Sequence, residues 1–236
     1  AELYGKITGC SRGKGGSMHM FDAGKHMLGG NGIVGSQIPV ATGVAFRIAY
    51  REEDGVVLCF FGDGAIHQGA FHESLNLARI WDLPIVYICE NNQYGMGTDF
   101  RRVSSVEDFS VMGASYGVEG QQVNGMSVLE VYDAVRKAAA RARKGDPGFL
   151  EIRTYRYRGH SMSDPAKYRT REELEEYRQQ DPIVQLRAVL RDNEKVTEEE
   201  FEALDGKVKE TVEACVEFAE KSEEPSLETL YEDVLA

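Results

Sequence analysis

Two apolar runs of strand length, joined by a helical pattern, stand out in the first half of the chain. Residues 56–61 (VVLCFF) and 85–89 (IVYIC) are continuously apolar. Between them Phe71, Leu75 and Ala78 recur at helical spacing. A continuous run, rather than an alternating one, indicates a strand buried on both faces. Strand, helix and strand with short connections predict a βαβ unit and hence a parallel sheet.

Further periodic segments surround this unit. Apolar positions at helical spacing predict a helix from Ser36 to about Tyr50, and Ser127 is placed to cap another that ends near Lys144. Residues 149–157 have the composition of a further strand. Residues 1–35 are rich in glycine and have no periodicity, which indicates a functional loop. Residues 99–118 are interpreted as a mobile connection.

The pattern becomes entirely helical after residue 170. Asp181 precedes Pro182, as expected for an N-cap followed by a first-turn proline. Thr197 and Glu200 form a capping-box pattern ahead of a long helix, and apolar positions recur again from residue 227 to 235. We therefore predict an α/β domain over residues 1–169, with a parallel sheet and helices on both faces. A helical extension over residues 170–236 is expected to pack on it.

The net charge of −12 is concentrated in that extension. From residue 170 onward there are 8 Lys and Arg against 21 Asp and Glu, whereas residues 1–169 carry 19 basic and 18 acidic side chains. This balance argues against nucleic acid as a partner, because phosphates require a basic surface. No run of about 18 apolar residues predicts a membrane-spanning helix. Four widely spaced cysteines (Cys10, Cys59, Cys89 and Cys215) predict neither a disulfide framework nor a zinc site, and they favour a reducing compartment.

The strongest candidate for chemistry is a pair of turns that follow the two apolar runs. Asp63 follows the first run, and Asn92 follows the second, with Tyr94 two residues beyond. Parallel strands end at the same edge of a sheet, where ligands of open α/β sheets bind. A carboxylate, an amide oxygen and a backbone carbonyl are oxygen ligands of the kind that Mg²⁺ prefers, and they leave room for phosphate oxygens and water.

Two other interpretations of these glycine-rich motifs were weighed. Asp-Gly and Asn-Asn sequences also occur in ordinary tight turns, but here two of them follow two buried strands. Residues 30–35 (GNGIVG) match the dinucleotide-binding fingerprint, and Glu52 and Glu53 follow at about the required distance. That fingerprint needs a strand directly before it, and residues 25–28 make a poor strand. Nicotinamide binding is therefore disfavoured.

Several motifs resemble a known family. Residues 62–64 (GDG), followed by 91–92 (NN), resemble the thiamin diphosphate motif of transketolases, pyruvate decarboxylases and 2-oxo acid dehydrogenases. Four stretches are similar to the alpha subunits of the pyruvate dehydrogenase family: residues 13–20 (GKGGSMHM), 30–35 (GNGIVG), 90–98 (ENNQYGMGT) and 155–165 (YRYRGHSMSDP). The similarity covers nearly the whole chain and implies the thiamin diphosphate-binding fold.

The resemblance assigns the metal and the diphosphate to the two turns. Asp63, Asn92 and the carbonyl of Tyr94 would hold Mg²⁺. Gly64 and Ala65 would contact the diphosphate of the cofactor.

The remaining roles implied by the resemblance fall on two other segments. Gly32 and Val34 would approach the aminopyrimidine ring, and Ile33 between them would support the bent cofactor. His160 would both contact the cofactor and act as the catalytic residue facing its reacting carbon. Ser161 matches a position phosphorylated in mitochondrial relatives, and we interpret it here as a residue that orders the loop.

One residue that thiamin enzymes need has no counterpart here. A glutamate hydrogen-bonded to the pyrimidine activates the cofactor, and in the family it comes from the beta chain; Glu90 is interpreted as structural. Family alpha chains also begin with a segment that this sequence lacks, and the chain has no initiator Met, so we expect it to be N-terminally truncated.

The expected function is oxidative decarboxylation of pyruvate with acetyl transfer to a lipoyl group. The expected partners are a beta subunit, in a heterotetramer of two alpha and two beta chains, and the lipoyl domain of an acyltransferase component. The expected compartment is the cytoplasm of a bacterium or the mitochondrial matrix of a eukaryote. Acetoin or branched-chain 2-oxo acid dehydrogenase and a non-catalytic cofactor-binding fragment remain as alternatives.

Overall fold

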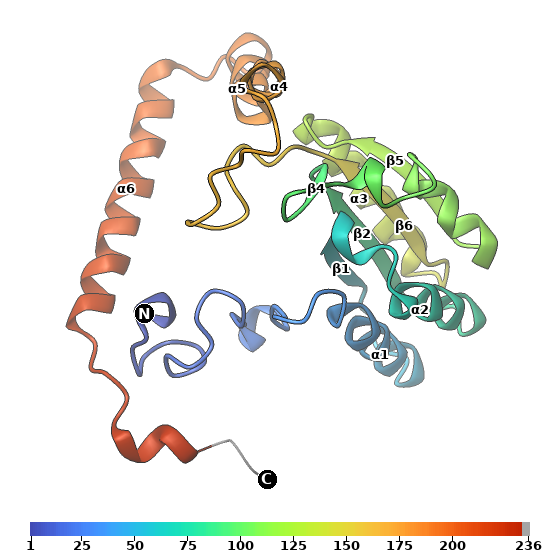
Figure 1. The fold of residues 1–236 in the computed structure, drawn as a ribbon, viewed down its shortest axis with the longest axis horizontal. Helices are drawn as coiled ribbons and strands as arrows, with labels where there is room; N and C mark the ends of the chain where they lie inside the picture. Colours follow the sequence, from blue (N-terminus) through green and yellow to red (C-terminus); the bar gives the residue numbers. More distant parts are fainter. Residues whose placement is uncertain (233–236) are drawn as a thin grey trace. The chain divides into compact units, whose positions relative to one another are not determined.

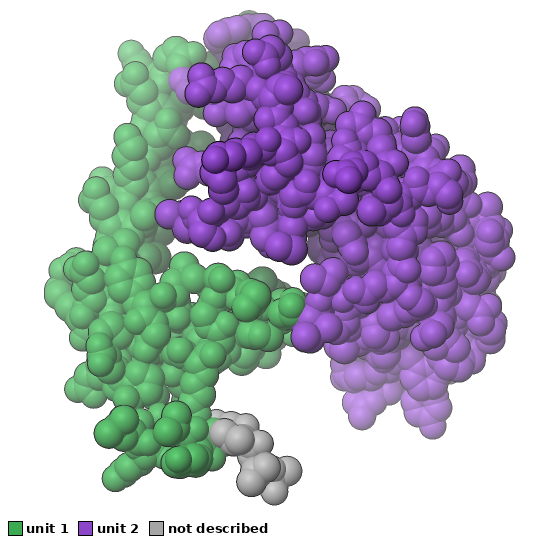
Figure 2. Space-filling view, viewed as in Figure 1, with its two compact units in different colours: residues 1–32, 194–236 green, residues 33–193 purple. Residues whose placement is uncertain are grey.

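A computed structural model describes residues 1–232, which fall into two compact units (Figures 1 and 2). One unit comprises residues 1–32 and the chain from residue 194 onward, and the other comprises residues 33–193. The expected boundary between residues 169 and 170 stays a prediction.

The larger unit is built around a four-stranded, fully parallel sheet in the order β1-β2-β6-β5. Its strands are β1 (Val57–Gly62), β2 (Ile85–Asn91), β5 (Glu119–Asn124) and β6 (Gly148–Arg153). A small antiparallel pair, β3 (Tyr94–Gly95) and β4 (Thr98–Asp99), follows β2. The prediction of a parallel sheet from the two apolar runs is confirmed.

Helices cover both faces of the sheet, as predicted (Figure 1). On one face lie α1 (Gln37–Tyr50) and α2 (Gly69–Ile80), whose core includes Phe71 and Leu75. On the other lies α3 (Val128–Ala142), where small alanines allow a close approach to Val86 and Ile88 of β2. The remaining helices of this unit are α4 (Arg171–Arg178) and α5 (Pro182–Asn193).

Side-chain caps fix several helix starts where the sequence predicts them. The hydroxyl of Ser127 accepts from the amide of Glu130 at the start of α3. The carboxylate of Asp181 accepts from the amide of Ile183 at 2.9 Å at the start of α5. Such caps satisfy amide donors that a helix leaves without an internal partner.

Strand β1 differs from expectation because it is an edge strand. Only the face that α1 and α2 cover is buried, and Leu58 and Phe60 on the opposite face are 39% and 49% exposed. The prediction that this strand is buried on both faces is therefore wrong for the described chain. A continuously apolar run cannot distinguish a central strand from an edge strand whose outer face is bare.

The segment interpreted as a mobile connection contains ordered structure. Two 3-10 helices, Phe100–Arg102 and Phe109–Tyr116, lie in it. Phe100 and Phe109 are buried in the main core, with ring centroids 5.3 Å apart. Strand β6 also ends at Arg153, four residues before the predicted end.

The smaller unit combines the glycine-rich N-terminal segment with α6 (Glu198–Lys221). The buried carboxylate of Glu2 accepts hydrogen bonds from the amides of Ser11, Gly13, Gly15 and Gly16. Helix α6 begins at the predicted capping box of Thr197 and Glu200. A short 3-10 helix spans Leu227–Tyr231, and the expected continuation through Val234 and Leu235 lies outside the described residues.

Within the described residues, no helix has the length and apolar character needed to cross a membrane. All four cysteines are free, and Cys59 and Cys89 are buried in the core.

Substituting Leu75→Ala tests the packing of α2 on the sheet. Leu75 is fully buried, so its truncation is expected to lower the free energy of unfolding by about 2–5 kcal/mol. The control Leu77→Ala removes the same atoms from a 36% exposed position on the same helix, and we expect a loss below about 1 kcal/mol. Equal losses in urea denaturation would contradict this packing.

Candidate functional site

Two turns meet at the carboxyl edge of the sheet. Strands β1 and β2 pair in parallel, with Gly62 opposite Glu90 at the last paired position. Asp63, the residue after β1, therefore lies next to the end of β2, which Asn92 follows. This is the edge at which open α/β sheets bind ligands.

The two turns lie close together at Gly64 and Gly95. A Cβ atom added to Gly95 would lie 3.6 Å from the Cα of Gly64 and 3.9 Å from Oδ2 of Asp63. A Cβ atom at either position would thus make ordinary van der Waals contact, and the glycine at 95 leaves that volume beside the carboxylate open. The structure thus brings the segment 63–65 together with the turn at 92–95.

Asp63 is a buried carboxylate that is only partly compensated. It is 5% exposed, and burial raises its pKa. Its own amide, the amide of Asn92 and the charge of Arg156 oppose this shift without cancelling it. Because an ionised carboxylate in this position is costly, a bound cation would stabilise it.

The Asn92 turn has an unusual backbone conformation. Gln93 has φ 77° and Met96 has φ 53°, in the left-handed region that non-glycine residues rarely adopt. The side-chain oxygen of Asn91 accepts from the amide of Gln93 at 3.1 Å, and that of Asn92 accepts from the amide of Tyr94 at 3.2 Å. Strain of this kind persists only where surrounding contacts enforce it, and it often marks functional sites.

Tyr94 is held at both its side chain and its carbonyl. Its hydroxyl donates to Glu173 at 2.7 Å, and Tyr155 donates to the same carboxylate at 2.9 Å. Burial and the nearby Glu173 raise the pKa of both phenols, that of Tyr155 to about 12. The carbonyl of Tyr94 accepts from the guanidinium of Arg156 at 2.9 Å. A carbonyl oxygen has two lone pairs, so one stays available for a metal.

The available ligand atoms suit Mg²⁺ better than a softer metal. The described residues hold no group of three or more His, Cys, Asp or Glu side chains that could bind a metal. Asp63, Asn92 and Tyr94 instead offer one carboxylate, one amide oxygen and one carbonyl. Mg²⁺ binds such hard oxygen ligands and is often completed by substrate phosphates and water.

His160 lies on the exposed loop after β6. The carboxylate of Asp164 accepts from the amide of His160 at 2.7 Å and from the hydroxyl of Tyr168 at 2.8 Å. These donors, together with the amide of Ala166, lower the pKa of Asp164. Arg156 joins this loop to the Asn92 turn, because its guanidinium also donates to Tyr168 at 2.9 Å. The hydroxyls of Ser161 and Ser163 lie 3.1 Å apart in the same loop.

The other predicted cofactor residues have contrasting environments. Ala65 is buried directly after Asp63 and Gly64. Ile33 and Val34 are 75% and 58% exposed, which suits residues that contact a ligand. Gly32 and Ile33 fall on opposite sides of the boundary between the two units, so the part of the cofactor that they contact stays a prediction.

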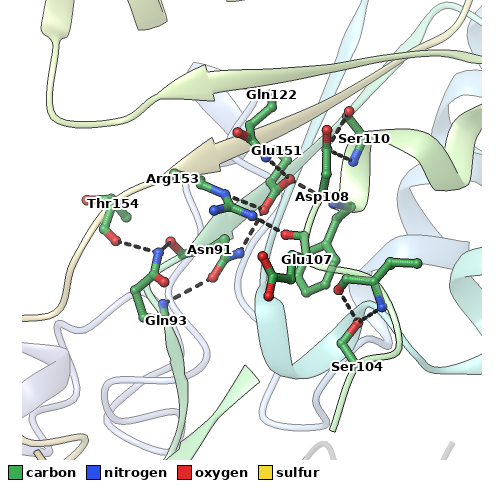
Figure 3. A network of polar contacts seen from close by, with 12 residues as sticks. Asn91, Gln93, Ser104, Glu107, Asp108, Ser110, Gln122, Glu151, Arg153 and Thr154 are labelled. Carbon is green, nitrogen blue, oxygen red and sulfur yellow. Dashed lines mark hydrogen bonds and ion pairs between the residues drawn. The ribbon is translucent and has the colours of Figure 1, made fainter. Parts of the chain in front are cut away.

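Three charged residues near the site escaped the sequence analysis. Arg156 and Glu173 hold Tyr94, and no local pattern distinguishes them from other charged residues. Glu151 is fully buried within β6 and bonds to Asn91 (Figure 3). An acidic residue inside an apolar strand was the signal that could have revealed it.

Comparison with known proteins gives a consistent result. The family model for the dehydrogenase E1 component matches residues 1–228. The chain is similar to the pyruvate dehydrogenase E1 component subunit alpha of Rickettsia bellii (strain RML369-C), with 48% identity over 99% of this chain and 72% of the relative. The corresponding subunit of Rhizobium meliloti (strain 1021) is 50% identical over 100% of this chain and 68% of its own length. The chain therefore belongs to the dehydrogenase E1 component family.

Proposed function

We propose that the chain is the alpha subunit of a pyruvate dehydrogenase that uses thiamin diphosphate and Mg²⁺. The observation that carries this proposal is the meeting of the Asp63 and Asn92 turns at the carboxyl edge of a parallel sheet. Membership of the E1 family implies dependence on thiamin diphosphate. The reaction is oxidative decarboxylation of pyruvate with transfer of the acetyl group to a lipoyl group.

The two turns are proposed to hold the cofactor through its diphosphate. Asp63, Asn92 and the carbonyl of Tyr94 bind Mg²⁺, and Gly64 and Ala65 contact the diphosphate. When bound, the cofactor supplies the nucleophilic carbon and the electron sink for decarboxylation. The rigid attachment of Tyr94 to Glu173 and Arg156 supports this role, because metal ligands need fixed positions.

The reacting end of the site is proposed to involve two other segments. Gly32 and Val34 contact the pyrimidine ring, Ile33 supports the bend of the cofactor, and His160 acts next to the substrate. The imidazole of His160 transfers a proton at the substrate oxygen or orients the incoming lipoyl group. The two ring nitrogens of a histidine can donate and accept a proton, which suits proton transfer.

A beta subunit is proposed to complete each active site and to provide the glutamate that activates the pyrimidine. Helix α6 supports a need for partners, because its apolar side chains Leu204, Val208 and Val212 are 58%, 53% and 56% exposed. The assembly contains two alpha and two beta chains and delivers acetyl groups to the lipoyl domain of an acyltransferase. The proposed compartment is the cytoplasm of a bacterium or the mitochondrial matrix of a eukaryote.

Asp63→Asn tests the metal assignment in the full-length chain assembled with its beta subunit. We expect Mg²⁺-dependent thiamin diphosphate binding to be lost in calorimetry. Because burial raises the pKa of Asp63, the stability of the metal-free parent falls as the pH rises through that pKa. The metal-free variant lacks this cost, so we expect it to be at least as stable at neutral pH.

The matched control is Asp54→Asn, which removes an exposed carboxylate before β1. It is expected to bind the cofactor as the parent does. Unchanged Mg²⁺ dependence in Asp63→Asn would show that the metal lies elsewhere.

His160→Ala in the same assembly is expected to reduce turnover by about 10²–10⁴ because an acid/base group is lost. The dissociation constant of thiamin diphosphate is expected to stay within a few-fold of the parent value, since the diphosphate site is intact. The control His72→Ala changes a histidine bonded to Tyr116 and should retain normal turnover. Normal turnover in His160→Ala would place His160 outside the chemistry.

Activity is expected to require a second polypeptide. The chain purified alone should not oxidise pyruvate in a ferricyanide-coupled assay, whereas addition of a beta subunit should restore the reaction. The reason is that none of the family motifs found in this sequence contains the glutamate that activates the pyrimidine. Robust oxidation by the homogeneous chain, with no second polypeptide in its mass spectrum, would refute this requirement.

A further inference from the structure

Glu151 is a fully buried carboxylate at the centre of a polar network (Figure 3). One of its oxygens accepts from the side-chain amide of Asn91 at 2.8 Å and from Nε of Arg153 at 3.1 Å. The other accepts from the backbone amide of Phe109 at 2.8 Å and from the side-chain amide of Gln122 at 3.0 Å. Four donors therefore converge on the two oxygens, and the carboxylate of Asp108 also lies against the side chain of Glu151.

The network begins in β6 and ends at the Asn92 turn. With its Nδ2 bound to Glu151, Asn91 presents its Oδ1 to the amide of Gln93 at 3.1 Å. That contact holds Gln93 in its left-handed conformation, at φ 77°. The position of Gln93 in turn fixes the direction of the residues on either side of it, Asn92 and Tyr94.

We propose that Glu151 is a positioning residue that sets the Asn92 turn for metal binding by fixing the orientation of Asn91. This inference rests on the proposed metal site. An amide side chain can be rotated so that its oxygen and nitrogen exchange places, and Asn91 is no exception. Only one orientation gives Gln93 an acceptor, and the carboxylate of Glu151 selects it.

Packing alone does not account for this arrangement. A purely structural role would explain why Glu151 ties Phe109 and Gln122 of the neighbouring segments to β6. It would not require the hydrogen bond from Asn91, the residue directly before the proposed metal ligand Asn92. Arg153, whose side chain is 33% exposed, balances the buried charge and stacks over Phe100 at 5.6 Å.

The first test is Glu151→Gln in the full-length chain assembled with its beta subunit. Each oxygen of Glu151 accepts from donors, so the glutamine side chain places its NH₂ group against donors in either of its two orientations. We expect Mg²⁺ affinity in the presence of thiamin diphosphate to fall about 10- to 100-fold, as for other residues that support metal ligands. The control Glu119→Gln removes an exposed carboxylate at the amino end of β5 and is expected to bind Mg²⁺ as the parent does.

The second test exchanges the two groups in the double variant Asn91→Asp, Glu151→Gln. The exchange keeps the net charge. The amide at position 151 now donates to the carboxylate at position 91, and the second oxygen of that carboxylate still accepts from the amide of Gln93. We expect Mg²⁺ affinity within about threefold of the parent, a recovery of the kind by which coupling of neighbouring residues is measured. A parent-like melting temperature without recovery of Mg²⁺ affinity would overturn the proposal, as would parent-like affinity in Glu151→Gln alone.

Hydrogen exchange of the metal-free proteins separates this inference from the proposed function. Glu151→Gln is expected to accelerate exchange at the amides of Gln93 and Tyr94, and the double variant is expected to restore their protection. If the unsubstituted protein does not bind Mg²⁺ and thiamin diphosphate, the proposed function is refuted. The hydrogen-exchange comparison would still decide the role of Glu151. Unchanged exchange in Glu151→Gln would refute that role.

Discussion

The parallel pairing of β1 with β2 is the constraint on which the site depends. Because the strands run in the same direction and in register, Asp63 and Asn92 emerge at one edge of the sheet. The core under α1 and α2 supports this register, and the two turns lie close together at Gly64 and Gly95. An antiparallel arrangement would place the same residues at opposite edges, and no local change of sequence could then bring the ligand atoms together.

This edge combines several features that are costly for stability. The carboxylates of Asp63 and Glu151 are buried, and Gln93 has a left-handed backbone conformation. Glu151 accepts from four donors within the chain, whereas Asp63 is compensated only in part, and burial raises its pKa. The difference fits two roles: Glu151 completes a fixed support, and Asp63 is left in need of a cation. Binding of a metal to the folded state would then add stability that the free chain lacks.

The sequence was sufficient for the main features of the fold and for the family. The apolar runs predicted β1 and β2, and capping residues predicted the starts of α3, α5 and α6. Strand β5 was missed because its sequence (EGQQVN) is polar, as an edge strand with one buried residue, Val123, permits. The order around Phe100 and Phe109 comes from packing between distant segments, which no local period encodes. Glu151 was missed for a similar reason: its partners are 29, 42 and 60 residues away.

The central claim is that Asp63, Asn92 and the carbonyl of Tyr94 form one Mg²⁺ site. The most direct measurement is a crystal structure of the chain assembled with its beta subunit, thiamin diphosphate and Mg²⁺. The account predicts one ion about 2.1 Å from an oxygen of each of the three residues, with diphosphate oxygens among the remaining ligands. An ion bound to the diphosphate without these three residues, or a cofactor at another edge of the sheet, would contradict the account.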